Sequence, residues 1–171
     1  MKKSAKGLSK DEILGLERTI RQAFQALNKL KQEEPLAKYI QYPKIPSIFS
    51  ESIAAKVLPH IFSGFEAIGG GITADILLVG EHGTKTVEVK ATGKSGFQYF
   101  GEKDCKADYL LWISFGDYFQ NDTGTIDVLI MPKINGLFKQ RKITLKDFKK
   151  VCDKKLILIE GKKILEIIDN R

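Results

Sequence analysis

The segment Ala67–Gly93, AIGGGITADILLVGEHGTKTVEVKATG, determines how the rest of the chain is arranged. It holds two runs rich in apolar and β-branched residues, Ile72–Val79 and Thr84–Ala91, on either side of residues 80–83. Those four residues, Gly-Glu-His-Gly, have the composition of a turn, and two such runs around a short turn are typical of a β-hairpin. We therefore predict two adjacent strands here.

Charged residues lie inside this hairpin, where burial disfavours them. Side chains alternate along a strand, so Glu88 and Lys90 share one face of the second strand, and Asp75 interrupts the apolar run of the first. A buried carboxylate is costly unless it is paired or binds a metal ion. Two carboxylates on adjacent strands offer the hard oxygen ligands that Mg²⁺ prefers. We interpret Asp75, Glu88 and Lys90 as a metal-dependent hydrolytic site. The Val89 carbonyl is a third candidate ligand, and Lys90 orients or deprotonates the attacking water.

Ala74-Asp75, followed after the turn by Glu88-Val89-Lys90, resembles the motif of the PD-(D/E)XK nuclease superfamily, which includes type II restriction endonucleases and archaeal Holliday-junction resolvases. The resemblance covers residues 51–115 and departs from the motif at Ala74, where the motif has proline. It implies an α/β, restriction-endonuclease-like core: a central mixed β-sheet flanked by α-helices, with the strands of Asp75 and Glu88 in the middle. It also implies that Glu51 reaches the metal site from a preceding helix and that Gln98 faces that site.

The composition fits one domain, residues 1–171, with 43% hydrophobic and 29% charged residues, as in ordinary globular proteins. A net charge of +7 favours a polyanionic partner. There is no run of about 18 apolar residues, and no apolar segment follows Met1-Lys2-Lys3. Cys105 and Cys152 lack the spacing of a metal site. We expect a cytoplasmic protein without a membrane span or secretory signal.

Leu8–Glu34, within the N-terminal segment 1–35, is predicted to form an amphipathic helix. Ser9 and Glu12 match the capping-box pattern at its start. Apolar residues recur along it at steps of three and four: Ile13, Leu16, Ile20, Ala23, Leu27 and Leu30. This stripe either covers the core of the domain or pairs two subunits. It spans fewer than three heptads, which is too short to establish a coiled coil.

A second helix is predicted from Ser47 or Ser50 to about Leu58, where Pro59 ends it. Glu51 then falls in its first turn, where a negative charge interacts favourably with the helix dipole. That structural role and the metal-site role are both open. We expect residues 69–71, three glycines, to form a turn, because they lack the ending of a phosphate-binding loop.

Residues 92–96, which follow the strand of Glu88 and Lys90, are predicted to form a polar loop next to the proposed site. Lys94 and Ser95 in this loop contact phosphates or belong to a simple connector. Phe97–Lys106 is predicted to be helical, and it carries Gln98.

The next two apolar runs, Asp108–Phe115 and Thr125–Met131, are predicted to be buried strands. The polar loop between them carries Tyr118 and Phe119, which we expect to be exposed. This loop caps the sheet or inserts into a groove of DNA.

The C-terminal part is rich in lysine, and a short helix opening at Thr144 is predicted within it, followed by a terminal hairpin of Leu156–Ile159 and Lys163–Ile168. The excess of basic over acidic residues predicts phosphate contacts, for which we select Lys149 and Lys150, although a solvated charged face is the alternative.

These features lead us to expect a Mg²⁺-dependent endonuclease acting on double-stranded DNA, with Mn²⁺ able to substitute. A type II restriction enzyme that cuts a short palindromic site as a homodimer fits best, because two copies about a two-fold axis match the two strands. One alternative is a structure-selective nuclease such as a Holliday-junction resolvase. Another is a non-catalytic nucleic-acid-binding protein in which the charged trio is a salt-bridge cluster.

Overall fold

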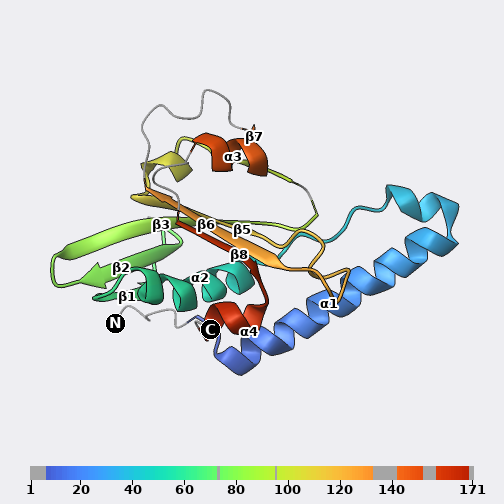
Figure 1. The fold of residues 1–171 in the computed structure, drawn as a ribbon, viewed down its shortest axis with the longest axis horizontal. Helices are drawn as coiled ribbons and strands as arrows, with labels where there is room; N and C mark the ends of the chain where they lie inside the picture. Colours follow the sequence, from blue (N-terminus) through green and yellow to red (C-terminus); the bar gives the residue numbers. More distant parts are fainter. Residues whose placement is uncertain (1–6, 73, 95, 133–141, 152–156, 170–171) are drawn as a thin grey trace.

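A computed structural model describes residues 7–72, 74–94, 96–132, 142–151 and 157–169, with the side chain of residue 151 left out. Its centre is a six-stranded mixed sheet in the order β1-β2-β3-β5-β6-β8, and helices cover both faces (Figure 1). This arrangement confirms the predicted α/β class. The strands of the sheet are β1 (Phe65–Gly69), β2 (Ile76–Gly80), β3 (Gly83–Thr92), β5 (Tyr109–Ser114), β6 (Ile126–Pro132) and β8 (Ile157–Lys162).

The remaining elements pack around this sheet, and β4 and β7 pair with each other in a separate two-stranded sheet. None of the described helices is long and apolar enough to cross a membrane. These elements are α1 (Lys10–Glu33), η1 (Pro35–Tyr39), α2 (Ser47–Ile61), β4 (Phe97–Tyr99), η2 (Asp104–Lys106), β7 (Lys142–Thr144), α3 (Leu145–Val151) and α4 (Ile164–Ile168).

The predicted hairpin is present as β2 and β3, which pair antiparallel from Gly80–Gly83 to Ile76–Val87. The first strand is shorter than predicted, because it begins at Ile76 and leaves Asp75 in the bend before it. β3 is parallel to β5 and lies in the middle of the sheet. A parallel pair needs a crossover connection, and residues 93–108, which include β4 and η2, provide it.

Two apolar clusters cover the two faces of the sheet. The larger cluster joins the sheet to α1, α2 and α4, with Phe49, Ile53 and Leu111 among its fully buried members. The smaller cluster, which includes Trp112 and Phe148, lies on the α3 side. Figure 1 shows α2 and α4 on one side of the sheet and α3 on the other. Both faces of the central strands are therefore covered.

α1 begins as the capping box predicts: the Ser9 amide donates to the Glu12 carboxylate at 2.7 Å, and the Glu12 amide donates to Ser9 Oγ at 3.3 Å. The first part of the apolar stripe covers the core, since Ile13 and Ile20 are buried. The stripe does not continue in this role, because Leu30 is 40% exposed. Beyond that point α1 and η1 project away from the sheet (Figure 1).

α2 begins at the earlier of its two predicted starts and is longer than predicted at its C-terminal end. It begins at Ser47 after Pro46, so Glu51 is not in its first turn, and the predicted interaction with the helix dipole there is wrong. Pro59 lies inside the helix, which ends at Ile61. A proline removes one N–H donor but leaves its carbonyl, and the helix still closes with the Phe62 amide donating to the Leu58 carbonyl at 2.8 Å.

The predicted helix Phe97–Lys106 is wrong. Phe97–Tyr99 instead forms β4, which pairs antiparallel with β7, and a single 3₁₀ turn, η2, follows. The partner strand, Lys142–Thr144, is more than forty residues away in the sequence. Such a pairing depends on tertiary contacts, which override local helix propensity.

The predicted exposure of Tyr118 and Phe119 is also wrong, since they are 5% and 1% exposed. The Phe119 ring lies 4.9 Å from that of Phe115 and 5.4 Å from that of Phe24 on α1. The Arg21 guanidinium covers the Tyr118 ring at 4.5 Å. This loop therefore caps the end of the sheet, as the first of its two predicted roles requires.

The C-terminal helix is confirmed as α3, where the Asp147 amide donates to Thr144 Oγ1 at 3.1 Å. The terminal hairpin is wrong: Ile157–Lys162 pairs with β6 as β8, and residues 164–168 form α4. The first residue of the predicted hairpin, Leu156, lies outside the described residues. α4 buries Ile164, Ile167 and Ile168 against the larger cluster, a helical spacing that favours packing over strand pairing.

Phe119→Ala tests the capping role of the loop. Removing this buried ring should lower the free energy of unfolding by about 3–5 kcal/mol, because a cavity replaces its aromatic contacts. Urea denaturation measures the loss. Leu36→Ala, at a residue that is 80% exposed, is the matched control and should change stability by less than about 0.5 kcal/mol. Similar values for the two variants would contradict the packing described.

Candidate active site

Asp75 is held at the end of the β2–β3 ladder. The last paired residues of that ladder are Ile76 and Val87, so β3 continues beyond β2. There the Val89 amide donates to Asp75 Oδ2 at 2.8 Å. The Asp75 carbonyl accepts a hydrogen bond from the Gly70 amide at 3.0 Å. The two bonds fix the side chain of Asp75 against the backbone between Glu88 and Lys90.

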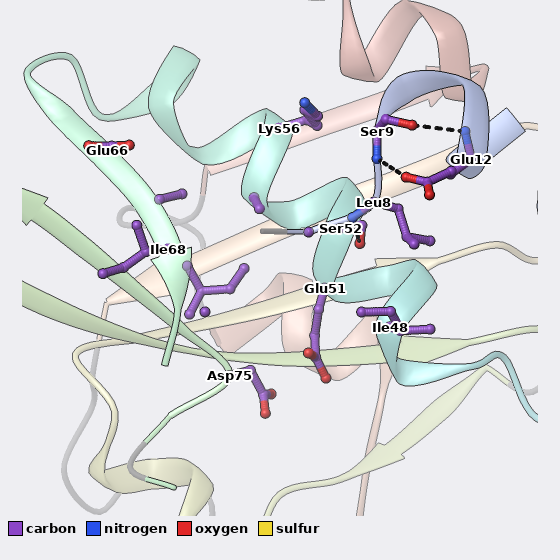
Figure 2. A pocket seen from close by; sticks show the side chains of 15 residues that line it. Leu8, Ser9, Glu12, Ile48, Glu51, Ser52, Lys56, Glu66, Ile68 and Asp75 are labelled. Atoms are coloured by element: carbon purple, nitrogen blue, oxygen red, sulfur yellow. Dashed lines mark hydrogen bonds between the residues drawn. The ribbon is translucent and has the colours of Figure 1, made fainter. Parts of the chain in front are cut away.

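Glu51 reaches the same place from α2. Figure 2 shows the carboxylates of Glu51 and Asp75 next to each other at one end of a cavity of about 720 Å³. Burial and the Asp75 carboxylate raise the pKa of Glu51, and a hydrogen bond with Ser47 opposes them. The structure thus brings together the predicted helical glutamate and the predicted strand aspartate.

Glu88 and Lys90 lie on one face of β3, as the alternation predicts. They are in register with Leu110 and Trp112 of β5, which belong to the smaller apolar cluster. Lys90 Nζ lies 3.1 Å from Glu88 Oε1, and Glu88 is only 8% exposed. The buried carboxylate is thus paired with the ammonium group two residues along the strand.

Asp104 is a member of this site that the sequence analysis missed. It lies on η2, and its Oδ1 is 3.1 Å from Lys90 Nζ. Its Oδ2 accepts a hydrogen bond from the Gly101 amide at 2.8 Å, which closes a short turn. An aspartate three residues after a glycine has turn-forming composition, a signal that the predicted helix over this segment concealed. Lys90 therefore has two carboxylate partners.

The pKa values in this cluster move in different directions. Burial raises the pKa of Glu88, and the Asp104 and Asp75 carboxylates add to this while Lys90 opposes it. Burial also acts to raise the pKa of Asp104, but the Gly101 amide and Lys90 outweigh it and the pKa is lowered. For Lys90, burial is outweighed by Glu88 and Asp104, so its pKa is raised. Lys90 is therefore an ammonium ion at neutral pH in this arrangement.

The donor chemistry around Asp75 fits a hard divalent cation. Asp75, Glu51 and Glu88 offer carboxylate oxygens. Burial is the main cause of the raised pKa values of the two glutamates, and the Asp75 carboxylate adds to both. A bound cation would relieve this repulsion. Within the described part of the chain, no three His, Cys, Asp or Glu side chains form a group arranged for a metal ion. The candidate metal ligands are therefore present, but Glu88 forms an ion pair with Lys90.

Those predicted phosphate-contacting residues that the structure describes lie outside this cluster. Lys94 faces Asp117 at 3.8 Å. Gln98, which the resemblance places facing the metal site, lies on β4 in register with Ile143 and lines a different cavity from that of Glu51 and Asp75. Lys149 has ion pairs with Asp127 at 3.3 Å and Glu160 at 2.6 Å. Lys150 is exposed on α3, and Ser95 lies outside the described residues. Contact of these residues with phosphate stays a prediction.

Glu51→Gln tests the electrostatic state of the cavity. Since the pKa of Glu51 is raised, the folded state holds this proton more tightly than the unfolded chain. The free energy of unfolding should therefore fall as pH rises from the ordinary glutamate value through the raised one. Glutamine does not ionise, so the Glu51→Gln variant should not show this fall in the free energy of unfolding. Without divalent metal, the variant should be at least as stable as wild type above that range, as thermal unfolding measures.

Addition of divalent metal should make the wild type more stable than Glu51→Gln. At a metal concentration about 100 times Kd the wild type should gain about 2.7 kcal/mol, and Glu51→Gln should gain less. Glu66→Gln is the control, because Glu66 lines the other end of the same cavity (Figure 2) and should leave the gain unchanged. Equal gains in wild type and Glu51→Gln would remove Glu51 from the metal site.

Gly70→Ala tests the placement of Asp75. A Cβ at residue 70 would overlap the Ala74 carbonyl oxygen, so the bend that carries Asp75 must shift. Metal affinity should fall by at least about tenfold, as for loss of a group that orients a ligand. Gly71→Asn is the control: Gly71 has φ +67°, which asparagine tolerates, and open space around its Cβ position. Unchanged affinity in Gly70→Ala would contradict this role of the bend.

Comparison with known proteins adds no relative to this picture. A scan against protein-family models gives no match, and a search of curated proteins also gives no match.

Proposed function

We propose that this chain is a divalent-metal-dependent endonuclease with a PD-(D/E)XK, restriction-endonuclease-like core, and that it hydrolyses phosphodiester bonds in double-stranded DNA. One observation carries the proposal: the Asp75 carboxylate bonds to the Val89 amide, which lies between Glu88 and Lys90. The aspartate of the motif thus contacts the backbone between its glutamate and its lysine. The order of α2, the antiparallel strands β1 to β3, and β5 parallel to β3 supports the same core.

The carboxylates of Asp75, Glu88 and Glu51 would hold Mg²⁺ or Mn²⁺, with the Val89 carbonyl as a further candidate ligand. Such an ion activates water and neutralises charge on the phosphate during attack. Glu51 acts beside Asp75 from α2, as their adjacent placement supports. Substituting Glu51 should therefore weaken cleavage less than substituting the strand residues.

Lys90 acts as a donor in this proposal. Because its two ion pairs raise its pKa, it holds its proton at neutral pH and is poorly suited to deprotonate water. An ammonium group at this position instead orients the nucleophile and stabilises the additional negative charge of the transition state. The sequence left two roles open for Lys90: orienting the attacking water or deprotonating it. The charges around Lys90 support the first role.

Asp104 is a positioning residue for Lys90. Glu88 is both an ion-pair partner of Lys90 and a metal-ligand candidate, so it has two competing roles. Asp104 is held in turn by the Gly101 amide and is an independent partner of Lys90. It would hold the ammonium group in place when Glu88 turns to the metal ion.

A homodimeric type II restriction enzyme that recognises a short palindrome is the form of this activity that we propose. Two copies about a two-fold axis place one active site on each strand. The projecting end of α1 carries exposed Leu30, followed by Leu36 on η1, and offers apolar surface for pairing. A structure-selective nuclease shares the same chemistry and differs in preferring four-way junctions to linear duplex.

A second candidate function has its own support. In a non-catalytic nucleic-acid-binding protein the charged residues would form a structural ion-pair cluster, and Lys90 does have two carboxylate partners. Such a protein would bind DNA but would not cut it in the presence of Mg²⁺ or Mn²⁺. The Asp75 carboxylate favours the nuclease, because it lies beside Glu51 and takes no part in the ion pairs of Lys90.

Substitutions at the active site should separate these functions. Asp75→Asn, Glu88→Gln and Lys90→Met should each reduce cleavage of plasmid DNA by about 10²–10³-fold, a typical loss when one group that stabilises the transition state is removed. Circular dichroism should show folded proteins. Fragment appearance under single-turnover conditions with Mg²⁺ measures the rates. Near wild-type rates in two of the three variants would overturn the assignment.

Asp104→Asn should show the pattern of a positioning residue. We expect a loss of about 10–100-fold together with a lowered pKa of Lys90, visible as a shift of the pH–rate profile toward lower pH. Asp117→Asn is the control, because Asp117 pairs with exposed Lys94 outside the cluster. A rate loss without any change in the pH profile would assign Asp104 a purely structural role.

A further inference from the structure

A second cavity, of about 700 Å³, begins where β3 ends. It lies between the segment that follows α1 and the start of β4, so it is separate from the cavity of Glu51 and Asp75. None of the residues that line it is acidic, whereas four are lysines. Its walls are Phe24, Lys31, Lys38, Tyr39, Ile40, Gln41, Tyr42, Pro43, Lys44, Ile45, Ala91, Thr92, Gly93, Lys94, Phe97 and Gln98.

The lysines of this cavity are largely available to an anionic ligand. Among the described residues, Lys31, Lys38 and Lys44 form no ion pair; Lys31 instead donates to the Lys38 carbonyl at 3.1 Å. Lys94 has a partner, Asp117, at 3.8 Å, with both side chains more than half exposed. Exposed pairs of this kind contribute little energy. The cavity of Glu51 and Asp75 has the opposite character, since four carboxylates and one lysine line it.

Aromatic rings provide the apolar part of the walls. Tyr39 is 73% exposed, and Lys38 Nζ lies 5.1 Å from its ring centroid. Lys31 Nζ is likewise 5.1 Å from the ring of Tyr42. Ammonium groups beside aromatic rings are a combination known from grooves that bind single-stranded nucleic acids, in which the cations contact phosphates and the rings stack on bases. On a duplex, the ammonium groups supply the contacts to the backbone phosphates.

The position of the cavity relates it to the active site. Ala91, Thr92 and Gly93 follow Lys90 directly on the chain and line the cavity. A strand rises about 3.3 Å per residue, which places Gly93 about 10 Å beyond Lys90.

We propose that this cavity binds the sugar–phosphate backbone of the DNA beside the cut. This inference rests on the proposed nuclease function. Lys38 and Lys44, which the sequence analysis did not select, are the principal phosphate contacts, and Lys94 assists them. These contacts hold the strand in register and carry no sequence preference.

The double variant Lys38→Gln/Lys44→Gln tests this inference. Binding of a fluorescein-labelled DNA duplex, measured by anisotropy in Ca²⁺ over a range of salt, should show a slope of log K against log salt reduced by about 1.8, or 0.9 for each lost contact. Affinity should fall equally for duplexes of different sequence. Thermal unfolding should show an unchanged midpoint, since both side chains are exposed.

The matched control is Arg18→Gln/Lys85→Gln, which removes the same charge. Arg18 is exposed on α1 and lines neither cavity, and exposed Lys85 lies toward the opposite end of β3. The control should keep the wild-type slope. A slope unchanged in the Lys38/Lys44 variant, or reduced equally in the control, would overturn the inference.

Plasmid cleavage by the wild type separates this inference from the proposed function. Absence of cleavage with Mg²⁺ and Mn²⁺ would overturn the nuclease assignment, whereas the salt slopes would still report whether the cavity binds DNA. Cleavage together with an unchanged slope in the Lys38/Lys44 variant would overturn the cavity assignment alone.

Discussion

The hydrogen bond from the Val89 amide to Asp75 Oδ2 is the contact on which the candidate active site depends. It forms because β3 is longer than β2, so that an amide of β3 meets a side chain from the bend instead of a strand partner. The bend in turn requires Gly70, where a side chain would overlap the Ala74 carbonyl. A local difference in strand length thus places a carboxylate between Glu88 and Lys90.

The charges around this contact explain why the site is both costly to fold and suited to chemistry. Burial and neighbouring carboxylates raise the pKa values of Glu51 and Glu88, so ionising them works against stability. Lys90 offsets part of this cost through two ion pairs, with Glu88 and Asp104. Of these charged groups, Glu51 and Asp75 line the cavity.

Local patterns predicted much of the fold. The β2–β3 hairpin, the capping box of α1 and the buried strands β5 and β6 follow from residues close in sequence. The pairing of β4 with β7 and the burial of Phe119 beneath α1 depend on segments far apart in the chain, and these predictions were wrong. Asp104 was missed for the same reason, because its role depends on a turn that brings it to Lys90. The meeting of Asp75 with Glu51 was expected from the family resemblance and not from any local pattern.

Binding of Mn²⁺ to the wild type and to Asp75→Asn, measured by titration calorimetry without DNA, tests the central claim most directly. Our account predicts saturable binding by the wild type and a loss of at least about tenfold in affinity when Asp75 no longer carries a charge. It predicts no such loss in Asp117→Asn, which removes a carboxylate outside the site. Equal affinity in wild type and Asp75→Asn, or no binding by the wild type, would contradict the account.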